Sequence, residues 1–252
     1  WFGIESYTTR YQSLVETAPL FRVDQDIEPL PQLAKSWEWS EDGKQLTMHL
    51  IEGAKWSDGV PFTADDVMFT WEGYVMDPNV NSGVRLDAFT WDGVATTLEK
   101  VDDYTIRFTF PVAFPYTVFY LLDDDGSFVV EPAHILKPLH PKWSETPTDY
   151  TQFENALPAD KLPLVTMGPW VITEYKTDEL MIMRRNPYFY GVDEAGNQLP
   201  YMDEIQYIKG TSGAGRDLCV MAGDCDHMNL ENASTFVEVM TRAQEPDATF
   251  EV

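Results

Sequence analysis

The chain has 252 residues, 44% of them hydrophobic and 23% charged, a composition typical of a globular protein with one large domain or two smaller ones. Its formal net charge of −25, from 42 acidic and 17 basic residues, argues against nucleic acid and anionic membrane surfaces as partners, because such a field repels phosphate groups. No apolar run is long enough to span a bilayer. The first residues have neither a leader pattern nor an initiator Met, so we expect a processed or trimmed piece of a longer product.

Residues 38–50 have the pattern of a β-hairpin. Tryptophans alternate with polar residues before the turn sequence EDGK, and Leu or Met alternates with polar residues after it. Gly43 in the turn can take a positive φ, which hairpin turns require. We therefore expect two antiparallel strands here.

A turn at Asp58 and Gly59 precedes a helix start with the sequence TADD at residues 63–66. The Thr63 hydroxyl can accept a hydrogen bond from the amide of residue 66, and the two following Asp residues complement the positive end of a helix. Apolar residues then recur at helical spacing. This spacing predicts a buried face formed by Val67, Trp71 and Tyr74 or Val75.

Alternation, proline and glycine mark the remaining elements. They predict a strand at 101–110 with a turn at Asp102 and Asp103, followed by a short helix or strand at 116–122. A proline-rich loop is expected at 132–163, with a short helix near 149–156. Strands are expected at 170–175, 180–184 and 205–208, and a helix at 216–222 that ends at Gly223. The chain ends on the extended apolar pattern ATFEV, as if cut at a connection.

The two cysteines, Cys219 and Cys225, are too few for a disulfide framework or a four-ligand zinc site. One small disulfide across CVMAGDC and two buried free thiols are both open alternatives. His227 completes a C-x5-C-x-H pattern, but the fourth ligand is missing, so we expect neither a metal nor a cofactor.

Four blocks of sequence occur in a fixed order. They are LPQLAKSWEWSEDGKQLTMHLIEGAKWSDGVPFTADDVMFTWE, then VDDYTIRFTF, then MGPWVITEYKTDELMIMRRNPYFYGVDEAGNQLPYMDEIQY, and finally VMAGDCDHMNL. Together they resemble the extracellular solute-binding proteins of family 5, the dipeptide-, oligopeptide- and nickel-binding components of ABC importers. The resemblance runs from about Val15 to the end of the chain. It departs from the family at Ile51, usually a basic residue, and at Met167, usually Thr.

The resemblance implies a mixed α/β fold of the type II periplasmic-binding-protein kind. Members are about twice this length and have two lobes around a cleft, so this chain corresponds to the first lobe, with the second lobe missing. We expect residues 1–36 and 164–252 to form the main subdomain, and residues 37–163 to form an inserted second subdomain.

The resemblance also implies a binding protein rather than an enzyme. It would capture a peptide-like solute in the cleft and deliver it to the membrane permease of an ABC transporter, in the periplasm or as a lipid-anchored protein on the cell surface. An oligosaccharide is the alternative solute, and a nickel chelate is a weaker one. A glycosidase using the acidic run Asp123, Asp124 and Asp125 is the rival class, although such runs are usually solvated turns. A pure interaction module is a third class, and it would need an exposed apolar patch.

We expect most aromatic residues to lie in the core, including Trp37, Trp39, Trp56 and Trp71. The stretch between the first helix and the next strand corresponds to a region that contacts ligand in the family. It supplies the ligand-binding candidates Arg85, Phe89 and Trp91, with Tyr116 and Trp170 as weaker candidates. A loop that packs on its own lobe is the alternative for this stretch.

Overall fold

The structure is a computed structural model that describes residues 19–23, 26, 28–80, 89–114, 121, 128–156, 161–177, 179–208, 213–226 and 235–245. Apart from Leu121, the predicted element at 116–122 lies outside the described residues, as do the acidic run at 123–125, His227 and the terminal ATFEV. The chain divides into two compact units, one of residues 1–175 and 182–205 and one of residues 176–181 and 206–252. The subdomain boundaries at 36/37 and 163/164 stay a prediction.

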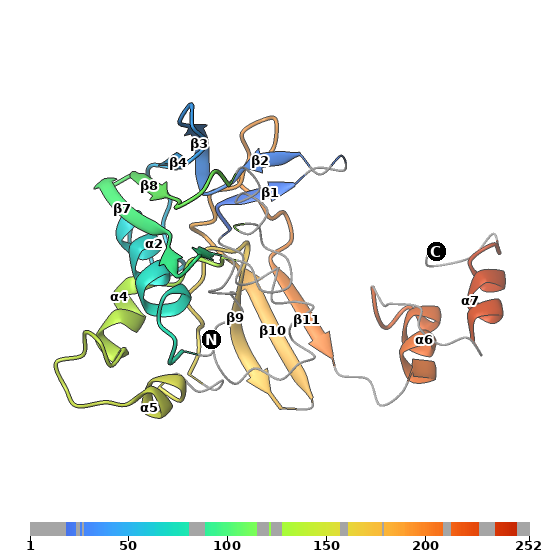
Figure 1. Ribbon diagram of the computed structural model, residues 1–252. Helices are drawn as coiled ribbons and strands as arrows, with labels where there is room; N and C mark the ends of the chain where they lie inside the picture. Colours follow the sequence, from blue (N-terminus) through green and yellow to red (C-terminus); the bar gives the residue numbers. More distant parts are fainter. Residues whose placement is uncertain are drawn as a thin grey trace. The chain divides into compact units, whose positions relative to one another are not determined.

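The first unit contains a four-stranded antiparallel sheet (Figure 1). Its spatial order is β3 (Ala34–Trp39), β4 (Gln45–Leu50), β8 (Thr105–Thr109) and β7 (Thr97–Asp102). The predicted hairpin is confirmed: Trp39 pairs with Leu46, and Gly43 has a φ of +66° in the turn. The single strand predicted at 101–110 is instead two strands, β7 and β8. The sequence does not reveal β7 because Leu98 is its one fully buried position.

One face of this sheet is covered by a helical segment. Leu46 and Phe108, on neighbouring strands, have no exposed surface. Helix α2 (Ala64–Thr70) lies next to β7 and to α4 (Ala133–Leu136), and the π-helix η1 (Trp71–Val75) continues it. The predicted apolar face of this segment is confirmed by the burial of Val67, Trp71, Tyr74 and Val75.

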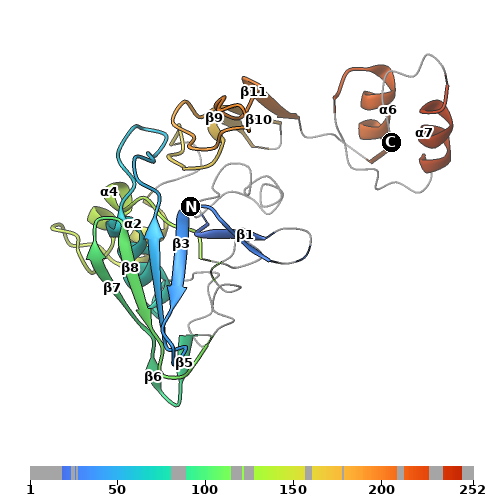
Figure 2. The same ribbon diagram turned by 90° about the horizontal axis from the view of Figure 1, so that it is seen from above.

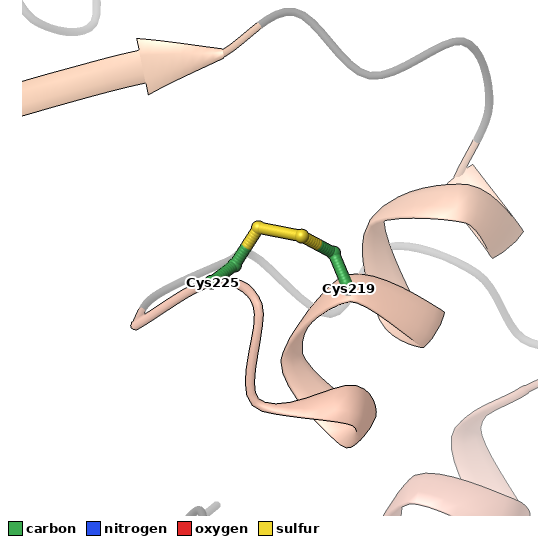
Figure 3. The surroundings of a disulfide bond; sticks show 2 residues. All are labelled: Cys219 and Cys225. Atoms are coloured by element: carbon green, nitrogen blue, oxygen red, sulfur yellow. A yellow bond between two sulfur atoms is a disulfide. The ribbon is translucent and has the colours of Figure 1, made fainter.

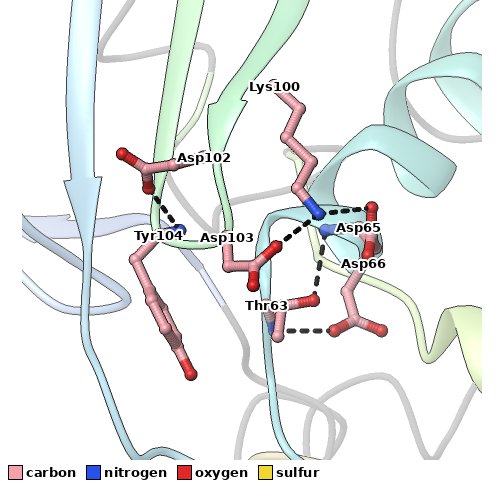
Figure 4. A network of polar contacts seen from close by, with 7 residues as sticks. All are labelled: Thr63, Asp65, Asp66, Lys100, Asp102, Asp103 and Tyr104. Carbon is pink, nitrogen blue, oxygen red and sulfur yellow. Dashed lines mark hydrogen bonds and ion pairs between the residues drawn. The ribbon is translucent and has the colours of Figure 1, made fainter.

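Helix α2 begins with a capping box at Thr63, as the sequence predicts (Figure 4). The Asp66 carboxylate accepts a hydrogen bond from the Thr63 N–H (3.0 Å), and the Thr63 hydroxyl accepts from the N–H groups of Asp65 (3.3 Å) and Asp66. The Lys100 ammonium on β7 lies 3.0 Å from the Asp65 carboxylate and 2.7 Å from that of Asp103. The cap therefore fixes the start of α2 against the turn between β7 and β8.

Several other predicted elements are confirmed, with shifted ends. They are α5 (Tyr150–Glu154), β9 (Trp170–Lys176), β10 (Leu180–Arg185), β11 (Glu204–Ile208) and α6 (Gly213–Ala222), of which the three strands form a sheet in the order β11-β10-β9. Elements that the sequence does not predict are β1 (Phe21–Val23), β2 (Pro29–Pro31), β5 (Thr90–Trp91), β6 (Val94–Ala95), α4, the 3-10 helix η3 (Lys137–Leu139) and α7 (Phe236–Arg242). Except for α7, each has four residues or fewer and is too short to show a clear period.

A second, smaller core surrounds His140, which has no exposed surface. Its Nε2 donates to the Gly73 carbonyl (3.1 Å), and its Nδ1 accepts from the Lys142 N–H (3.1 Å). Both bonds together require the neutral imidazole. Burial lowers the pKa of His140, although the Asp77 carboxylate at 3.6 Å favours the charged form.

Replacing Thr63 by Ala removes the helix cap. We expect the free energy of unfolding to fall by about 1 kcal/mol, measured by urea denaturation. Thr97→Ala, at an exposed position at the start of β7, serves as the control and should change it by less than about 0.5 kcal/mol. Equal effects of the two substitutions would show that the cap contributes nothing.

His140 makes the protein acid-sensitive. Because its folded pKa lies below the ordinary value of about 6.5, the unfolded chain takes up the proton first as the pH falls. The stability that neutral His140 contributes is therefore complete above this value and is lost on acidification. We expect the difference in thermal midpoint between wild type and His140→Gln to shrink from pH 7 to pH 5. A constant difference contradicts the assignment.

Candidate functional site

Of the predicted ligand-binding residues, Arg85 and Tyr116 lie outside the described residues. Phe89 has no exposed surface, and its ring packs edge-on against Trp71 with centroids 5.1 Å apart. Trp170 opens β9 and is also buried. Their contact with a ligand stays a prediction.

Trp91 has a different environment, because its side chain is half-buried. It ends β5, which pairs with β6 through a tight turn at Asp92 and Gly93 with φ values of +49° and +78°. Figure 2 shows this hairpin at one end of the four-stranded sheet. The structure thus brings Phe89 and Trp91 into one hairpin and leaves Trp170 on another sheet.

Trp91 belongs to a cluster that we call the aromatic patch, formed by Trp39, Trp91 and Phe114, all half-buried. The Trp91 and Phe114 ring centroids are 4.7 Å apart, and Trp39 lies 5.8 Å from the buried Phe110 beneath the patch. Val94 and Val112 add apolar surface, with exposed fractions of 58% and 37%.

Sequence reasoning missed Trp39 and Phe114 as surface residues. Trp39 and Trp37 were expected in the core, yet both are half-buried, whereas Trp56 and Trp71 are buried as expected. The position of Trp39 at the end of a strand, beside turns, could have indicated that its side chain is exposed, since a sheet covers side chains less at its ends.

Backbone hydrogen bonds hold the aromatic patch in place. The Phe110 N–H donates to the Lys44 carbonyl (2.8 Å), and the Phe114 N–H donates to the Gly43 carbonyl (3.2 Å). On the other side, the Thr96 N–H donates to the Phe89 carbonyl (2.8 Å). The rings are therefore carried by two fixed turns and the segment between them.

Three segments meet at what we call the junction, formed by residues 56–60, 166–169 and 186–188. The Ser57 N–H donates to the Thr166 carbonyl (2.9 Å), and the Ser57 hydroxyl accepts from the Thr166 N–H (3.1 Å). Gly59, with a φ of +88°, lies under the Tyr188 ring, and a Cβ there would meet that ring at 3.3 Å.

Asn186 completes the junction and has no exposed surface. Its Nδ2 donates to the Gly168 carbonyl (2.9 Å), and its Oδ1 accepts from the Tyr188 N–H (2.9 Å). Its own N–H donates to the Pro169 carbonyl (2.9 Å). The side chain thus satisfies backbone groups that burial would otherwise leave without partners.

In the second unit, a disulfide joins Cys219 on α6 to Cys225 in the following loop (Figure 3). Of the two alternatives left open by the sequence, the structure contains the bonded form. Asp217, on the same helix, is 1% exposed, and its carboxylate oxygens have no hydrogen-bond partner among the residues that the structure describes.

Titratable side chains of the first unit connect elements of its framework. Burial raises the pKa of Asp66, whose carboxylate also accepts from the Ala133 N–H (3.0 Å) and so connects α2 to α4. His134 on α4 lies 2.8 Å from the Asp58 carboxylate. Within the described ranges, no group of three or more His, Cys, Asp or Glu side chains could hold a metal ion. In the same ranges, no helix has the length and apolarity needed to cross a bilayer.

Residues 28–247 match the family model described as bacterial extracellular solute-binding proteins, family 5, middle region, and the chain therefore belongs to this family.

Among known proteins, the chain is 49% identical over 251 residues to the periplasmic alpha-galactoside-binding protein of Rhizobium meliloti, covering 98% of this chain and 35% of that protein. It is 29% identical over 193 residues to the periplasmic oligopeptide-binding protein OppA of Escherichia coli, covering 71% of this chain and 32% of that protein. The chain thus spans about a third of the length of these relatives, less than the half that the resemblance led us to expect.

Among solved structures, it resembles the periplasmic binding protein MelB of Agrobacterium fabrum C58 in complex with stachyose, with a TM-score of 0.77 and 50% identity over 93% of this chain and 35% of that one. It also resembles an oligopeptide-binding protein OppA, with a TM-score of 0.81 and 29% identity over 97% of this chain and 40% of that one.

Three expectations from the sequence are thereby confirmed. The family is the one that the four blocks resemble, and the fold is its mixed α/β periplasmic-binding-protein fold, present as a partial chain. The family consists of binding proteins, so the expectation of a binding protein rather than an enzyme is confirmed and the glycosidase alternative is rejected. Its members are extracellular, and the R. meliloti relative is periplasmic, which agrees with the expected extracytoplasmic location.

Asn186 provides a test of the junction. Asn186→Ala removes one buried and one partly buried side-chain hydrogen bond and should lower the free energy of unfolding by about 2–3 kcal/mol. Asn197→Ala, an exposed asparagine of the same loop that donates to Asp193, is the matched control and should cost less than about 1 kcal/mol. The account of the junction fails if the two variants unfold at the same urea concentration.

Proposed function

We propose that this protein is the solute-binding component of an ABC importer and that its solute is an oligosaccharide of the α-galactoside class. The observation that carries the proposal is the 49% identity over 98% of the chain to an alpha-galactoside-binding protein, against 29% to an oligopeptide-binding one. The sequence alone favours a peptide by family frequency, and the comparisons favour the oligosaccharide alternative instead.

The chemistry of the described surface supports a neutral, hydroxyl-rich solute. The net charge of −25 disfavours an anionic one. Half-buried aromatic rings offer an apolar face to the C–H bonds of a sugar, as Trp91 does. Of the residues predicted from the sequence, Trp91 is therefore the foremost proposed contact, with Arg85, Phe89, Tyr116 and Trp170 as further ones.

The proposed mechanism is closure of two lobes on the solute. This chain would supply the first lobe, of the type II kind, with residues 37–163 as a subdomain inserted between residues 1–36 and 164–252. Enclosure excludes water and strengthens each hydrogen bond to the solute. The closed form would then dock on a membrane permease and release the solute to it.

A peptide is the second candidate solute. It is supported by the TM-score of 0.81 to an oligopeptide-binding protein, but that likeness comes with 29% identity and reflects mainly the backbone. Side chains decide which solute is held, so the higher sequence identity carries more weight.

The test is a thermal-shift and calorimetric comparison on the protein expressed from its full gene. Stachyose and raffinose should raise the unfolding midpoint, since a ligand at 100 times its Kd stabilises the folded state by about 2.7 kcal/mol. Tri- and tetrapeptides and cello-oligosaccharides are the controls and should leave it unchanged. A shift with peptides and none with galactosides contradicts the proposal.

A further inference from the structure

Resting on the proposed function, we propose that Trp39 and Phe114 join Trp91 as aromatic contacts for the sugar rings of the solute. Trp91 alone is a candidate from the sequence. The structure adds two rings from other segments, Trp39 from the end of β3 and Phe114 from the segment after β8, and packs them around the same buried Phe110.

The three rings of the patch pack against the core of the first unit, but none of them is fully buried. Phe110 and Phe108 already fill the space beneath, with 2% and 0% of their surfaces exposed. The rings above them remain half-buried, the exposed Val94 is the cross-strand partner of Trp91, and the exposed Val112 lies two residues before Phe114. Contiguous exposed apolar groups on a soluble protein usually mark a binding surface.

The aromatic patch is also fixed before any solute arrives. Trp91 stands edge-on to Phe114 at an interplanar angle of 66° and to Phe110 at 84°. The backbone on both sides is held by the hydrogen bonds of Phe110 and Phe114 to the turn at residues 40–44. A surface that is already ordered loses little conformational entropy on binding.

The chemistry of the patch fits a sugar. One face of a pyranose carries C–H groups that pack on an aromatic ring, while its hydroxyls point outward along the edge. The exposed Asp92 carboxylate, next to Trp91 in the turn, is an acceptor suited to such a hydroxyl. The aromatic rings and the Asp92 carboxylate thus offer a neutral sugar an apolar contact and a hydrogen-bond acceptor.

The experiment is isothermal calorimetry of stachyose binding to the protein expressed from its full gene. Trp91→Ala and Trp39→Ala should each weaken binding about tenfold, a loss of about 1.4 kcal/mol. Trp91→Phe should retain most of the affinity because a ring remains. Trp37→Ala is the matched control, since Trp37 is half-buried on the same strand but packs on Phe21 at 4.5 Å, and it should change affinity less than about twofold.

A second measurement separates stacking from packing. Because both rings pack on Phe110, Trp91→Ala and Trp39→Ala should lower the thermal midpoint without solute, and the inference requires that they also weaken the Kd for stachyose. If these variants lower that midpoint and leave the Kd for stachyose unchanged, the rings serve packing alone and the inference is wrong. The inference is also wrong if neither the thermal midpoint nor the Kd for stachyose changes in these variants.

The same measurements distinguish a failure of the proposed function from a failure of the inference about the aromatic patch. If wild type binds no galactoside at all, the function falls and the inference about the aromatic patch falls with it. If wild type binds stachyose and all four variants bind it equally well, the function stands and only the assignment of the patch is overturned.

Discussion

One set of buried and partly buried hydrogen bonds holds three segments of the first unit together, those of the junction between Ser57, Thr166 and Asn186. These residues lie far apart in the sequence, and their bonds place the turn after the β3–β4 hairpin against the segments that lead into β9 and follow β10. Because the groups are buried, an alternative arrangement would leave backbone polar groups without partners at a cost of about 1–3 kcal/mol each. The junction therefore selects one placement of these segments.

This constraint separates the framework from the surface that meets a solute. The residues around the Asp58–Gly59 turn are occupied by contacts to His134, Thr166 and Tyr188, so they hold the structure together. The aromatic patch is carried instead by the turns at residues 40–44 and 92–93, and its rings remain half-exposed. A binding protein needs this division, because a firmly held framework lets a surface change its side chains without losing the fold.

Local features of the fold could be predicted from the sequence because their signals are local. Gly43 marks a turn that needs positive φ, Thr63 and Asp66 form a cap within four residues, and Trp71 follows the helical period of the buried face. The packing of Trp39 on Phe110 could not be predicted, because Phe110 lies on a segment some 70 residues further along the chain. Asn186 was missed for the same reason, since its partner Gly168 lies on another segment. Family resemblance supplied the fold class, and the choice between peptide and sugar needed the comparison of whole sequences.

Amide hydrogen exchange of the full protein, with and without stachyose, tests the central claim most directly. The account predicts slower exchange on adding stachyose at residues 40–44, 92–96 and 110–114 around the aromatic patch. It also predicts that residues 56–60 and 166–169 of the junction are already protected and do not change. Slower exchange at the junction, with none around the aromatic patch, would contradict the separation of framework from binding surface.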